Sequence, residues 1–425
     1  MDVFKEYDVR GIYPNELDEA AALRIGEAIG SYADSETVFL GNDNRKGSLA
    51  IKQSFVKGLV KTGKQAIDLG TGPVSLPAFA SFRRKSHAVC ITASHNPAEY
   101  TGMLLYRDGV TVRPSLFKPF YDHGHFAAGK GLYSEYDYSE EYAEYVTRGM
   151  HSIELNIGVD CMGGAATNLA KRILESVGSS VRMYHARMSG TFYGKAPEPS
   201  AENCDALGKL VAKSGLDFGV QLDGDGDRVA FVDEKGSFVN PMTAAMIFIK
   251  YLSLKKVVAT VACSRRLEDY AKVSYAKVGR PYLEEKIKNE SCDFGIETSM
   301  HFYFGKYYPF SDAILASLLM ASVINETRMK LSDIASEFPK IYQGEFKARL
   351  EGEQSAQTVM ERAEAMAPSG SAIDRTDGIK IITESGFMLI RKSNTEPLLR
   401  VYYEGDTRQA MEAMKELASK IVNAK

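Results

Sequence analysis

A chain of 425 residues, 44% hydrophobic and 25% charged, is too long for one hydrophobic core and should divide into roughly three or four domains. Its net charge of −3 leaves no broad basic surface for nucleic acid or an anionic membrane, so we expect neither as a partner. A small-molecule substrate fits this composition better.

Export and disulfide bonding are also disfavoured. The N-terminal segment has no apolar signal core, and the longest apolar stretches, at 242–249 and 313–324, are shorter than the roughly 18 residues that cross a bilayer. We therefore expect a cytoplasmic protein. The five scattered cysteines form no C-x-x-C pair, and we expect reduced core thiols rather than disulfides or zinc ligands.

Three stretches share one order, an apolar strand, a turn of small residues and an amphipathic helix. Their strands begin roughly a hundred residues apart, which is enough for each unit to form a domain with a mostly parallel sheet covered by helices. The three strand and helix pairs are 37–41 with 48–60, 156–161 with 165–177, and 256–262 with 266–275.

The pattern changes after about Pro339. A charged helix over 353–367, strands at 378–383, 387–391 and 399–403, and a closing helix over 407–422 predict a smaller α+β domain. The expected fold class is therefore α/β, with three α/β domains followed by this C-terminal domain. The expected boundaries are 1–148, 149–242, 243–340 and 341–425.

A serine stands on a short polar turn directly after an apolar strand at 88–91. The turn is Thr92-Ala93-Ser94-His95-Asn96-Pro97. Ser94 displays a hydroxyl there that can carry a phosphoryl group.

The segment Asp223-Gly224-Asp225-Gly226-Asp227-Arg228 places three carboxylates at alternate positions, which suits a hard divalent cation. An EF-hand calcium loop is the obvious alternative, since Glu234 falls at its last ligand position. Arg228 stands where that loop needs glycine, however, and the flanks 216–222 and 229–232 predict strands rather than helices. We therefore predict Mg²⁺ in a strand-to-strand loop, with a solvated turn as the remaining alternative; zinc lacks Cys or His ligands.

Charge balance adds a requirement. Three carboxylates and a phosphoserine beside one divalent ion leave excess negative charge, so a substrate phosphate can approach only where arginines line the site. Arg10 and Arg228 are the candidates. Serine and aspartates together predict metal-assisted phosphoryl transfer.

Two further polar loops follow predicted strands. The turn Arg391-Lys392-Ser393-Asn394-Thr395-Glu396-Pro397 combines a guanidinium with hydroxyl, amide and backbone donors, which suits a phosphate. The cluster Glu297-Thr298-Ser299-Met300-His301 offers a carboxylate, hydroxyls and an imidazole to sugar hydroxyls. An ordinary turn and a surface loop are the alternatives.

Taken in order, these segments resemble motifs of the α-D-phosphohexomutase family, most closely its phosphomannomutase/phosphoglucomutase branch, over essentially the whole chain. The opening 4–11 is similar to F-x-x-Y-D-[IV]-R-G, residues 92–97 to the phosphoserine loop, and 223–228 to the metal loop D-G-D-x-D-R. Residues 296–301 resemble G-E-x-S-G-H, and 391–397 resemble R-x-S-N-T-E-P.

The resemblance implies four domains around a central cleft that holds the active site. It implies that phosphorylated Ser94 passes its phosphoryl group to a mannose or glucose phosphate, that the bisphosphate turns round, and that the other phosphoryl group returns to Ser94. The implied cofactors are Mg²⁺ and a hexose 1,6-bisphosphate activator. The implied residues are Ser94, Arg10, His95 and Arg228 for catalysis, Tyr7, Glu297, Ser299, His301, Arg391, Ser393, Asn394 and Thr395 for substrate, and Ser94, Asp223, Asp225 and Asp227 for the metal.

Two lysines of the family pattern are missing. Leu104 replaces one that is thought to move the proton of the attacking hydroxyl, and such catalysis is typically worth a factor of about 10²–10⁴. His95 is a candidate replacement. Glu284 stands where a substrate-binding lysine is usual, which reverses the charge offered to a sugar phosphate, and Arg280 or Lys286 is the candidate substitute.

Ile296 and Met300 also stand at family glycines, and each adds a side chain where the backbone approaches a ligand. These departures keep open a second class, a catalytically weak or inactive phosphosugar-binding protein with a regulatory role. A phosphoglucosamine mutase is a further alternative, although 7–10 and 297–299 resemble the mannose/glucose branch more. The pattern specifies neither the preferred sugar nor the oligomeric state.

Overall fold

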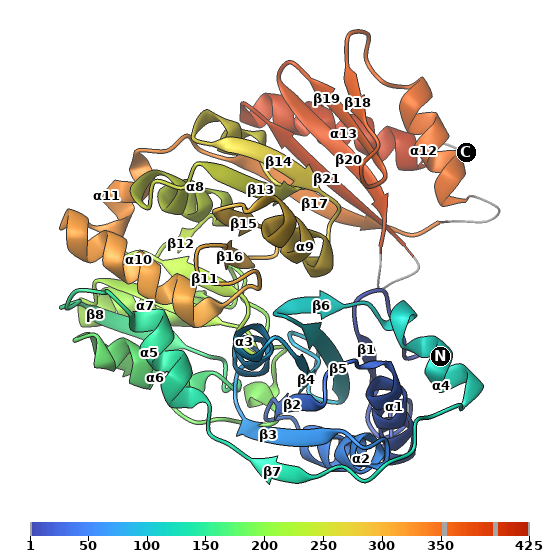
Figure 1. The fold of residues 1–425 in the computed structure, drawn as a ribbon. Coiled ribbons are helices and arrows are strands. Elements are labelled where there is room, and N and C mark those ends of the chain that lie inside the picture. Colours follow the sequence, from blue (N-terminus) through green and yellow to red (C-terminus); the bar gives the residue numbers. More distant parts are fainter. Residues whose placement is uncertain (1, 351–354, 394–397, 424–425) are drawn as a thin grey trace.

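The computed structural model describes residues 2–350, 355–393 and 398–423 and contains four sheets, one for each domain (Figure 1). In Figure 1 the N-terminal sheet lies at the bottom and the C-terminal sheet at the top. The four-domain architecture expected from the sequence is confirmed, with mixed sheets in the three α/β domains. The exact boundaries remain predictions.

The first domain is built on a seven-stranded sheet. Its strands are β1 (Val9–Ile12), β2 (Thr37–Asn42), β3 (Gln65–Thr71), β4 (His87–Ile91), β5 (Tyr100–Arg107), β6 (Val110–Val112) and β7 (Tyr133–Glu135), and its helices are α1 (Glu19–Tyr32), α2 (Ser48–Lys61), α3 (Ser75–Arg84), α4 (Lys118–His123) and α5 (Ser139–Thr147). The order is β1-β5-β4-β2-β3-β7, with β6 paired to β5. Strands β4, β2, β3 and β7 pair in parallel, and β1, β5 and β6 form antiparallel pairs.

Alternation along β5 decides which side chains face the other domains. Met103 and Leu105 pack with α1 and α2 on one face of the sheet. Leu104 and Tyr106 point to the opposite face, where α3 and α5 pack and where one hydrophobic core continues into the second and third domains. Residues on this face of β5 therefore lie at a junction between domains.

The second domain carries the aspartate loop between two strands. Its elements are β8 (Asn156–Asp160), β9 (Ser180–Met183), β10 (Phe218–Leu222), β11 (Val229–Val232), β12 (Phe238–Val239), α6 (Thr167–Ser176) and α7 (Asp205–Ser214). The order is β12-β11-β10-β8-β9, with β8 parallel to both neighbours and the other pairs antiparallel. The strands predicted on either side of the aspartates are confirmed as β10 and β11.

The third domain contains β13 (Lys256–Thr260), β14 (Lys272–Ala276), β15 (Phe294–Ile296), β16 (Phe302–Phe304), α8 (Pro241–Tyr251), α9 (Arg280–Glu290), α10 (Ala313–Thr327) and α11 (Leu331–Ser336). The helix predicted over 266–275 is wrong. Only a 3-10 turn, Arg265–Asp269, forms there, and β14 follows, parallel to β13. The alternation of Val273 and Tyr275, both good strand formers, outweighs the helical spacing of the residues before them.

The C-terminal domain is an antiparallel sheet in the order β17-β21-β20-β19-β18 with two helices. Its elements are β17 (Tyr342–Ala348), β18 (Ala372–Asp374), β19 (Ile379–Thr383), β20 (Gly386–Lys392), β21 (Leu399–Gly405), α12 (Ala356–Ala365) and α13 (Arg408–Asn423). Arg265 of the third domain donates to the carbonyls of Thr383 at 3.1 Å and Glu384 at 2.6 Å, and pairs with Asp406 at 2.6 Å. These bonds tie the fourth domain to the third.

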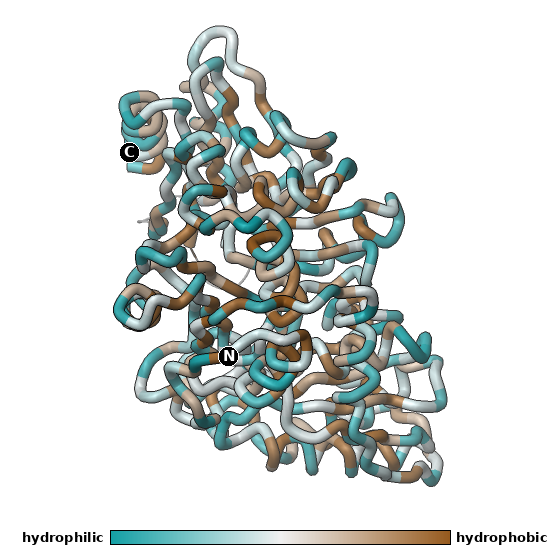
Figure 2. The backbone as a smooth tube through the Cα atoms, turned by 90° about the vertical axis from the view of Figure 1, so that its left-hand side faces the viewer, coloured by the Kyte–Doolittle hydropathy of each residue, from teal (hydrophilic) through white to brown (hydrophobic). Residues whose placement is uncertain are grey.

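Hydrophobic segments gather in the middle of the molecule, and hydrophilic ones colour its outer loops (Figure 2). All five cysteines are buried, as predicted, and all five are free thiols in this structure. Within the described ranges, no helix combines the length and the apolarity that a membrane crossing requires.

His87 begins β4, the strand that leads to the Ser94 turn, and it makes stability depend on pH. Its ring is 1% exposed, and burial lowers its pKa from 6.5 to about 4. The unfolded chain takes up this proton near pH 6.5, so stability falls as the pH drops from there toward 4. We expect this group to remove roughly 2 kcal/mol from the free energy of unfolding between pH 7 and pH 5.

His87→Gln should abolish that part of the pH dependence, because the glutamine amide does not titrate. The Tm of both proteins at pH 7 and pH 5, measured by calorimetry, checks this. An equal fall in Tm for the two proteins would contradict it.

Candidate active site

Ser94 lies on the turn after β4 with a backbone φ of +49°, a conformation that residues other than glycine seldom adopt. Such strain persists only where the surroundings hold it. The Ser94 N–H donates to Thr92 Oγ1 at 2.9 Å. The guanidinium of Arg45 donates to the carbonyl of Ser94, to that of Asn96 at 2.9 Å and to that of Pro97 at 2.6 Å.

Arg45 is a site residue that the sequence analysis missed. Its side chain is buried and pairs with the equally buried Asp43 at 2.8 Å. The signal that could have found it is the polar run Asn42-Asp43-Asn44-Arg45, which begins at the last residue of β2, the parallel neighbour of β4. The ends of parallel neighbours meet at one edge of a sheet, so this run lies beside the serine turn.

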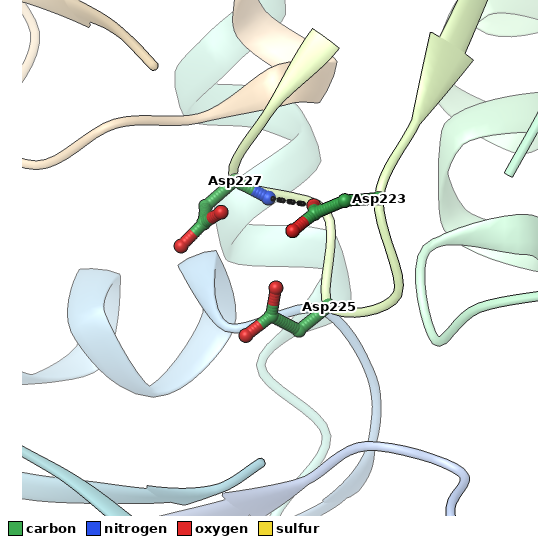
Figure 3. A group of neighbouring side chains, drawn as sticks. All are labelled: Asp223, Asp225 and Asp227. Atoms are coloured by element: carbon green, nitrogen blue, oxygen red, sulfur yellow. Dashed lines mark hydrogen bonds between the residues drawn. The ribbon is translucent and has the colours of Figure 1, made fainter. Parts of the chain in front are cut away.

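The three aspartates follow one another round the loop between β10 and β11 (Figure 3). Asp223, Asp225 and Asp227 are buried, and one carboxylate oxygen of each lies within 4.8 Å of the others. Glycine is required at 224, because a Cβ there would come within 2.8 Å of the Ser94 carbonyl oxygen. The loop and the serine turn are therefore in close contact.

Two hydrogen bonds join the serine turn to the aspartate loop. Ser94 Oγ donates to Asp223 Oδ2 at 2.9 Å, and Thr92 Oγ1 donates to Asp225 Oδ2 at 2.9 Å. The structure thus brings together two motifs from different domains that the sequence separates by 129 residues.

Crowding of the three carboxylates shifts their acidity. Burial, followed by repulsion from Asp227, raises the pKa of Asp223 well above its usual range and that of Asp225 to about 6. Burial opposes ionisation of Asp227 as well, but Arg280 and His301 hold its pKa well below the usual range. The cluster therefore carries repulsion that a bound cation would relieve.

The cluster fits Mg²⁺. Asp225 Oδ1 is buried and accepts no hydrogen bond from any described residue, and the three close carboxylates are the oxygen donors that this ion prefers. The serine hydroxyl lies at the edge of the same group of oxygens. Asp223, Asp225 and Asp227 are thus close enough to share one cation, and their role as its ligands stays a prediction.

Arg228 connects the aspartate loop to two histidines. Its Nη2 lies 2.9 Å from His95 Nδ1, and its Nε lies 3.3 Å from His301 Nε2. His95 Nδ1 is also 3.3 Å from Ser94 Oγ. Burial, together with Arg228 and Arg10, holds the pKa of His95 well below its usual range, so the ring is neutral at pH 7 and Nδ1 accepts a hydrogen bond.

Arg10 and Tyr7 come from the N-terminal segment. Arg10 donates to Asn96 Oδ1 in the serine turn and pairs with Asp8. Tyr7 Oη donates to the carbonyl of Val278 at 2.7 Å, so Tyr7 bridges the first and third domains. Both residues border the region between the domains.

The predicted sugar loop lies against the aspartates. His301 Nε2 is 3.2 Å from Asp227 Oδ1, and Ser299 Oγ is 2.9 Å from His301 Nδ1. Glu297 is 5% exposed and accepts a hydrogen bond from Tyr303 Oη at 2.6 Å. Glu297 Oε1 also lies 3.6 Å from His301 Nδ1, so Glu297, Ser299 and His301 form one connected group beside the metal loop.

The two non-glycine residues of this loop behave differently. Met300 has a φ of +67°, in the left-handed region that favours glycine, so its side chain is a source of backbone strain. Ile296 is fully buried in β15, and its side chain packs in the core rather than beside a ligand.

The phosphate turn is described only in part, because Asn394 and Thr395 lie outside the described residues. Arg391 is 2% exposed, and its Nε donates to Asp377 Oδ2 at 2.7 Å. Its Nη2 is buried and has no hydrogen-bond partner among the described residues. Ser393, two residues later, is also buried.

The expectation that Glu284 offers its charge to a sugar phosphate is wrong. Glu284 is fully buried in α9 and accepts the N–H of Thr111 at 2.7 Å, so it faces the first domain rather than a ligand. Lys286 does not replace the missing lysine either. Its Nζ donates to the carbonyl of Tyr275 at 3.0 Å, within the third domain.

Leu104 and Arg280 occupy opposite sides of the domain junction. Leu104 is 4% exposed and belongs to the core, so it carries no proton. Arg280 enters the site from α9, pairs with Asp227 and donates from Nη1 to Tyr106 Oη at 2.9 Å. Of the two proposed substitutes for the substrate lysine, only Arg280 reaches the aspartates.

Models of one protein family match four consecutive stretches that cover most of the chain. Models described as phosphoglucomutase/phosphomannomutase alpha/beta/alpha domains I, II and III and C-terminal domain match residues 1–118, 137–236, 240–342 and 345–421. A phosphoglucomutase/phosphomannomutase of Thermococcus kodakarensis is 30% identical over 99% of this chain and 98% of its own. A probable phosphoglucosamine mutase of Methanosarcina barkeri is 30% identical, with 99% of both chains covered.

A solved structure supports the fold. The structure of a phosphoglucomutase/phosphomannomutase family protein from Burkholderia thailandensis matches with a TM-score of 0.92. The match is 23% identical and covers 100% of this chain and 97% of the other.

Replacing one aspartate should weaken cation binding. Asp225→Asn keeps the shape of the side chain but removes one of the charges, so the Kd for Mg²⁺ measured by calorimetry should rise about tenfold or more. Asp233→Asn is the matched control, because Asp233 accepts the N–H groups of Lys235 and Ser237 in the next turn, outside the cluster. Equal affinities of the two variants would rule out the aspartate cluster as the metal site.

Proposed function

The chain belongs to the phosphoglucomutase/phosphomannomutase family, and from this membership and the geometry of the site we propose that it interconverts the 1- and 6-phosphates of mannose, glucose or both. The observation that carries the proposal is the 2.9 Å hydrogen bond from Ser94 Oγ to Asp223 Oδ2. It sets a hydroxyl that can carry a phosphoryl group against a group of carboxylates that can hold a divalent cation.

In the proposed reaction, phosphorylated Ser94 donates its phosphoryl group to the free hydroxyl of a hexose phosphate. The bond from phosphorus to the serine oxygen breaks and a bond to the sugar oxygen forms. The sugar hydroxyl loses a proton and the serine oxygen gains one, so that free Ser94 is a hydroxyl again. The bisphosphate turns round, and its other phosphoryl group returns to Ser94. Hexose 1,6-bisphosphate from solution is the activator, since it can phosphorylate the free serine by the reverse step.

The aspartates hold the metal in this proposal. Asp223, Asp225 and Asp227, with a phosphate oxygen on Ser94, would bind Mg²⁺, which supplies positive charge next to the transferred group when bound. Position matters as much as charge in phosphoryl transfer. Arg45 donates hydrogen bonds to the carbonyls of the serine turn and so keeps the nucleophile in place.

Three further residues surround the phosphoryl group in the proposal. Arg10 and Arg228 offset the negative charge of the transferred group, since both lie within hydrogen-bond reach of the turn from Ser94 to Asn96. His95 orients the Ser94 oxygen. A neutral ring that already accepts a bond from Arg228 is better suited to that role than to taking up a proton.

The remaining residues bind the sugar phosphate. Glu297, Ser299 and His301 are assigned to the sugar hydroxyls, because this connected group can bond equivalent hydroxyls in either orientation. Tyr7 borders the same junction. The group assigned to the phosphate that does not react is Arg391, Ser393, Asn394 and Thr395, and the unpartnered Nη2 of Arg391 supports it.

A phosphosugar is the proposed partner, and the cytoplasm is the proposed location, since five unbonded cysteines fit a reducing compartment. Glucosamine phosphate is a second candidate substrate, because the Methanosarcina relative is named a probable phosphoglucosamine mutase.

A coupled assay tests the proposal. Purified protein with Mg²⁺ and a trace of bisphosphate should turn over mannose 1-phosphate or glucose 1-phosphate faster than glucosamine 1-phosphate. Ser94→Ala should lose at least about 10³ of kcat, because no carrier of the phosphoryl group remains.

Ser134→Ala, which alters an exposed serine on β7, is the matched control and should keep full activity. No turnover by folded protein that binds a phosphosugar would favour a binding protein instead. Faster turnover of the glucosamine ester would reassign the substrate.

A further inference from the structure

Arg280 reaches from the third domain into both of the others that form the site. It is the first residue of α9, and its side chain is 10% exposed. One nitrogen, Nη1, donates to Tyr106 Oη of the first domain at 2.9 Å, and the other, Nη2, pairs with Asp227 of the second. A single guanidinium therefore touches an aspartate of the metal cluster and a residue of β5.

Tyr106 lies near position 104, where the family pattern has a lysine and this chain has Leu104. Leu104 and Tyr106 are two residues apart on β5 and therefore point to the same face, about 7 Å apart along the strand. A side chain at 104 thus projects beside the group that Arg280 binds. The positive charge that Leu104 lacks is present on the same face of β5, carried by a residue of another domain.

Glu284 is a third residue next to this guanidinium. It lies four residues after Arg280, one turn along the same face of α9, and its carboxylate is fully buried. Burial raises its pKa to about 7, while Arg280 favours its ionised form. Glu284 is thus a neighbour of the guanidinium within the junction, and Leu104 lies two residues from Tyr106, which the guanidinium contacts.

Two aspartates connect the guanidinium to the reacting oxygen. Asp227, which it pairs with, has a carboxylate oxygen within 4.8 Å of one on Asp223, and Asp223 accepts the hydrogen bond of Ser94 Oγ. An arginine remains charged at every physiological pH, so it offsets charge but does not act as a base.

We propose that Arg280 is a positioning residue that offsets the negative charge of the aspartate cluster and of the phosphoryl group on Ser94. From the third domain it replaces the positive charge that positions 104 and 284 lack. The proposal rests on the proposed mutase function for its activity readout, but its effect on cation binding is independent of turnover.

Three variants test it in the coupled assay. Arg280→Gln should lower kcat about a hundredfold while KM changes less than about threefold, because a charge next to the transferred group is lost. Arg280→Lys keeps the charge and should retain at least about a tenth of kcat. Arg113→Gln is the matched control: it breaks the 2.8 Å ion pair to Glu285, another contact between the first domain and α9, and should leave kcat unchanged.

Calorimetry with Mg²⁺ alone supplies a second readout. Arg280 competes with a cation for Asp227, so Arg280→Gln should bind Mg²⁺ at least about fivefold more tightly than the wild type. A residue that merely clamps the domains together would not change this affinity.

The outcomes separate the two proposals. Wild-type turnover that Arg280→Gln retains within about threefold would overturn the role of Arg280. Equal losses in the glutamine and lysine variants with unchanged Mg²⁺ affinity would overturn it as well, since they indicate a clamp. A wild type without turnover would contradict the mutase function instead, and the Mg²⁺ affinities would then decide the role of Arg280.

Discussion

Three buried carboxylates with oxygens within 4.8 Å of one another are the constraint on which the rest of this site depends. Charges removed from water are costly unless they are paired or bind a metal. Within the second domain, Arg228 is the nearby cation, and its Nε lies 4.0 Å from Asp223 Oδ2. Further compensation comes from the other domains, because Arg280 of the third domain pairs with Asp227 and Thr92 of the first domain donates a hydrogen bond to Asp225. The charge cluster thus helps to hold three domains together.

The same contacts prepare the site for phosphoryl transfer. Ser94 has an unfavourable φ, yet the buried Arg45 and Asp43 pair fixes its turn, so the hydroxyl points to the aspartates without further ordering. Ser94, Arg45 and Asp43 lie on turns that directly follow strands of the first sheet, so the sheet fixes their positions. The serine turn, the aspartate loop and the sugar loop therefore come from three different domains and meet at one junction.

The local sequence pattern predicted most strands and helices correctly. It failed where contacts between residues distant in the sequence determine the structure. The strands around Asp223–Asp227 and the C-terminal α+β domain were predictable, because alternation and turn residues are local signals. Arg45 was missed and Glu284 was misplaced, since only the packed domains show that one grips the serine turn and the other is buried against Thr111. The helix at 266–275 was wrong because pairing with β13 overrides helical spacing. Asn394 and Thr395 stay predictions.

The central claim is that Ser94 carries the phosphoryl group next to the aspartate cluster. Mass spectrometry of the digested protein after incubation with glucose 1,6-bisphosphate and Mg²⁺ tests it most directly. The account predicts one phosphate, located on Ser94, and none on Ser94→Ala treated in the same way. Phosphate on another residue of the wild type, or persistent labelling of Ser94→Ala, would contradict it.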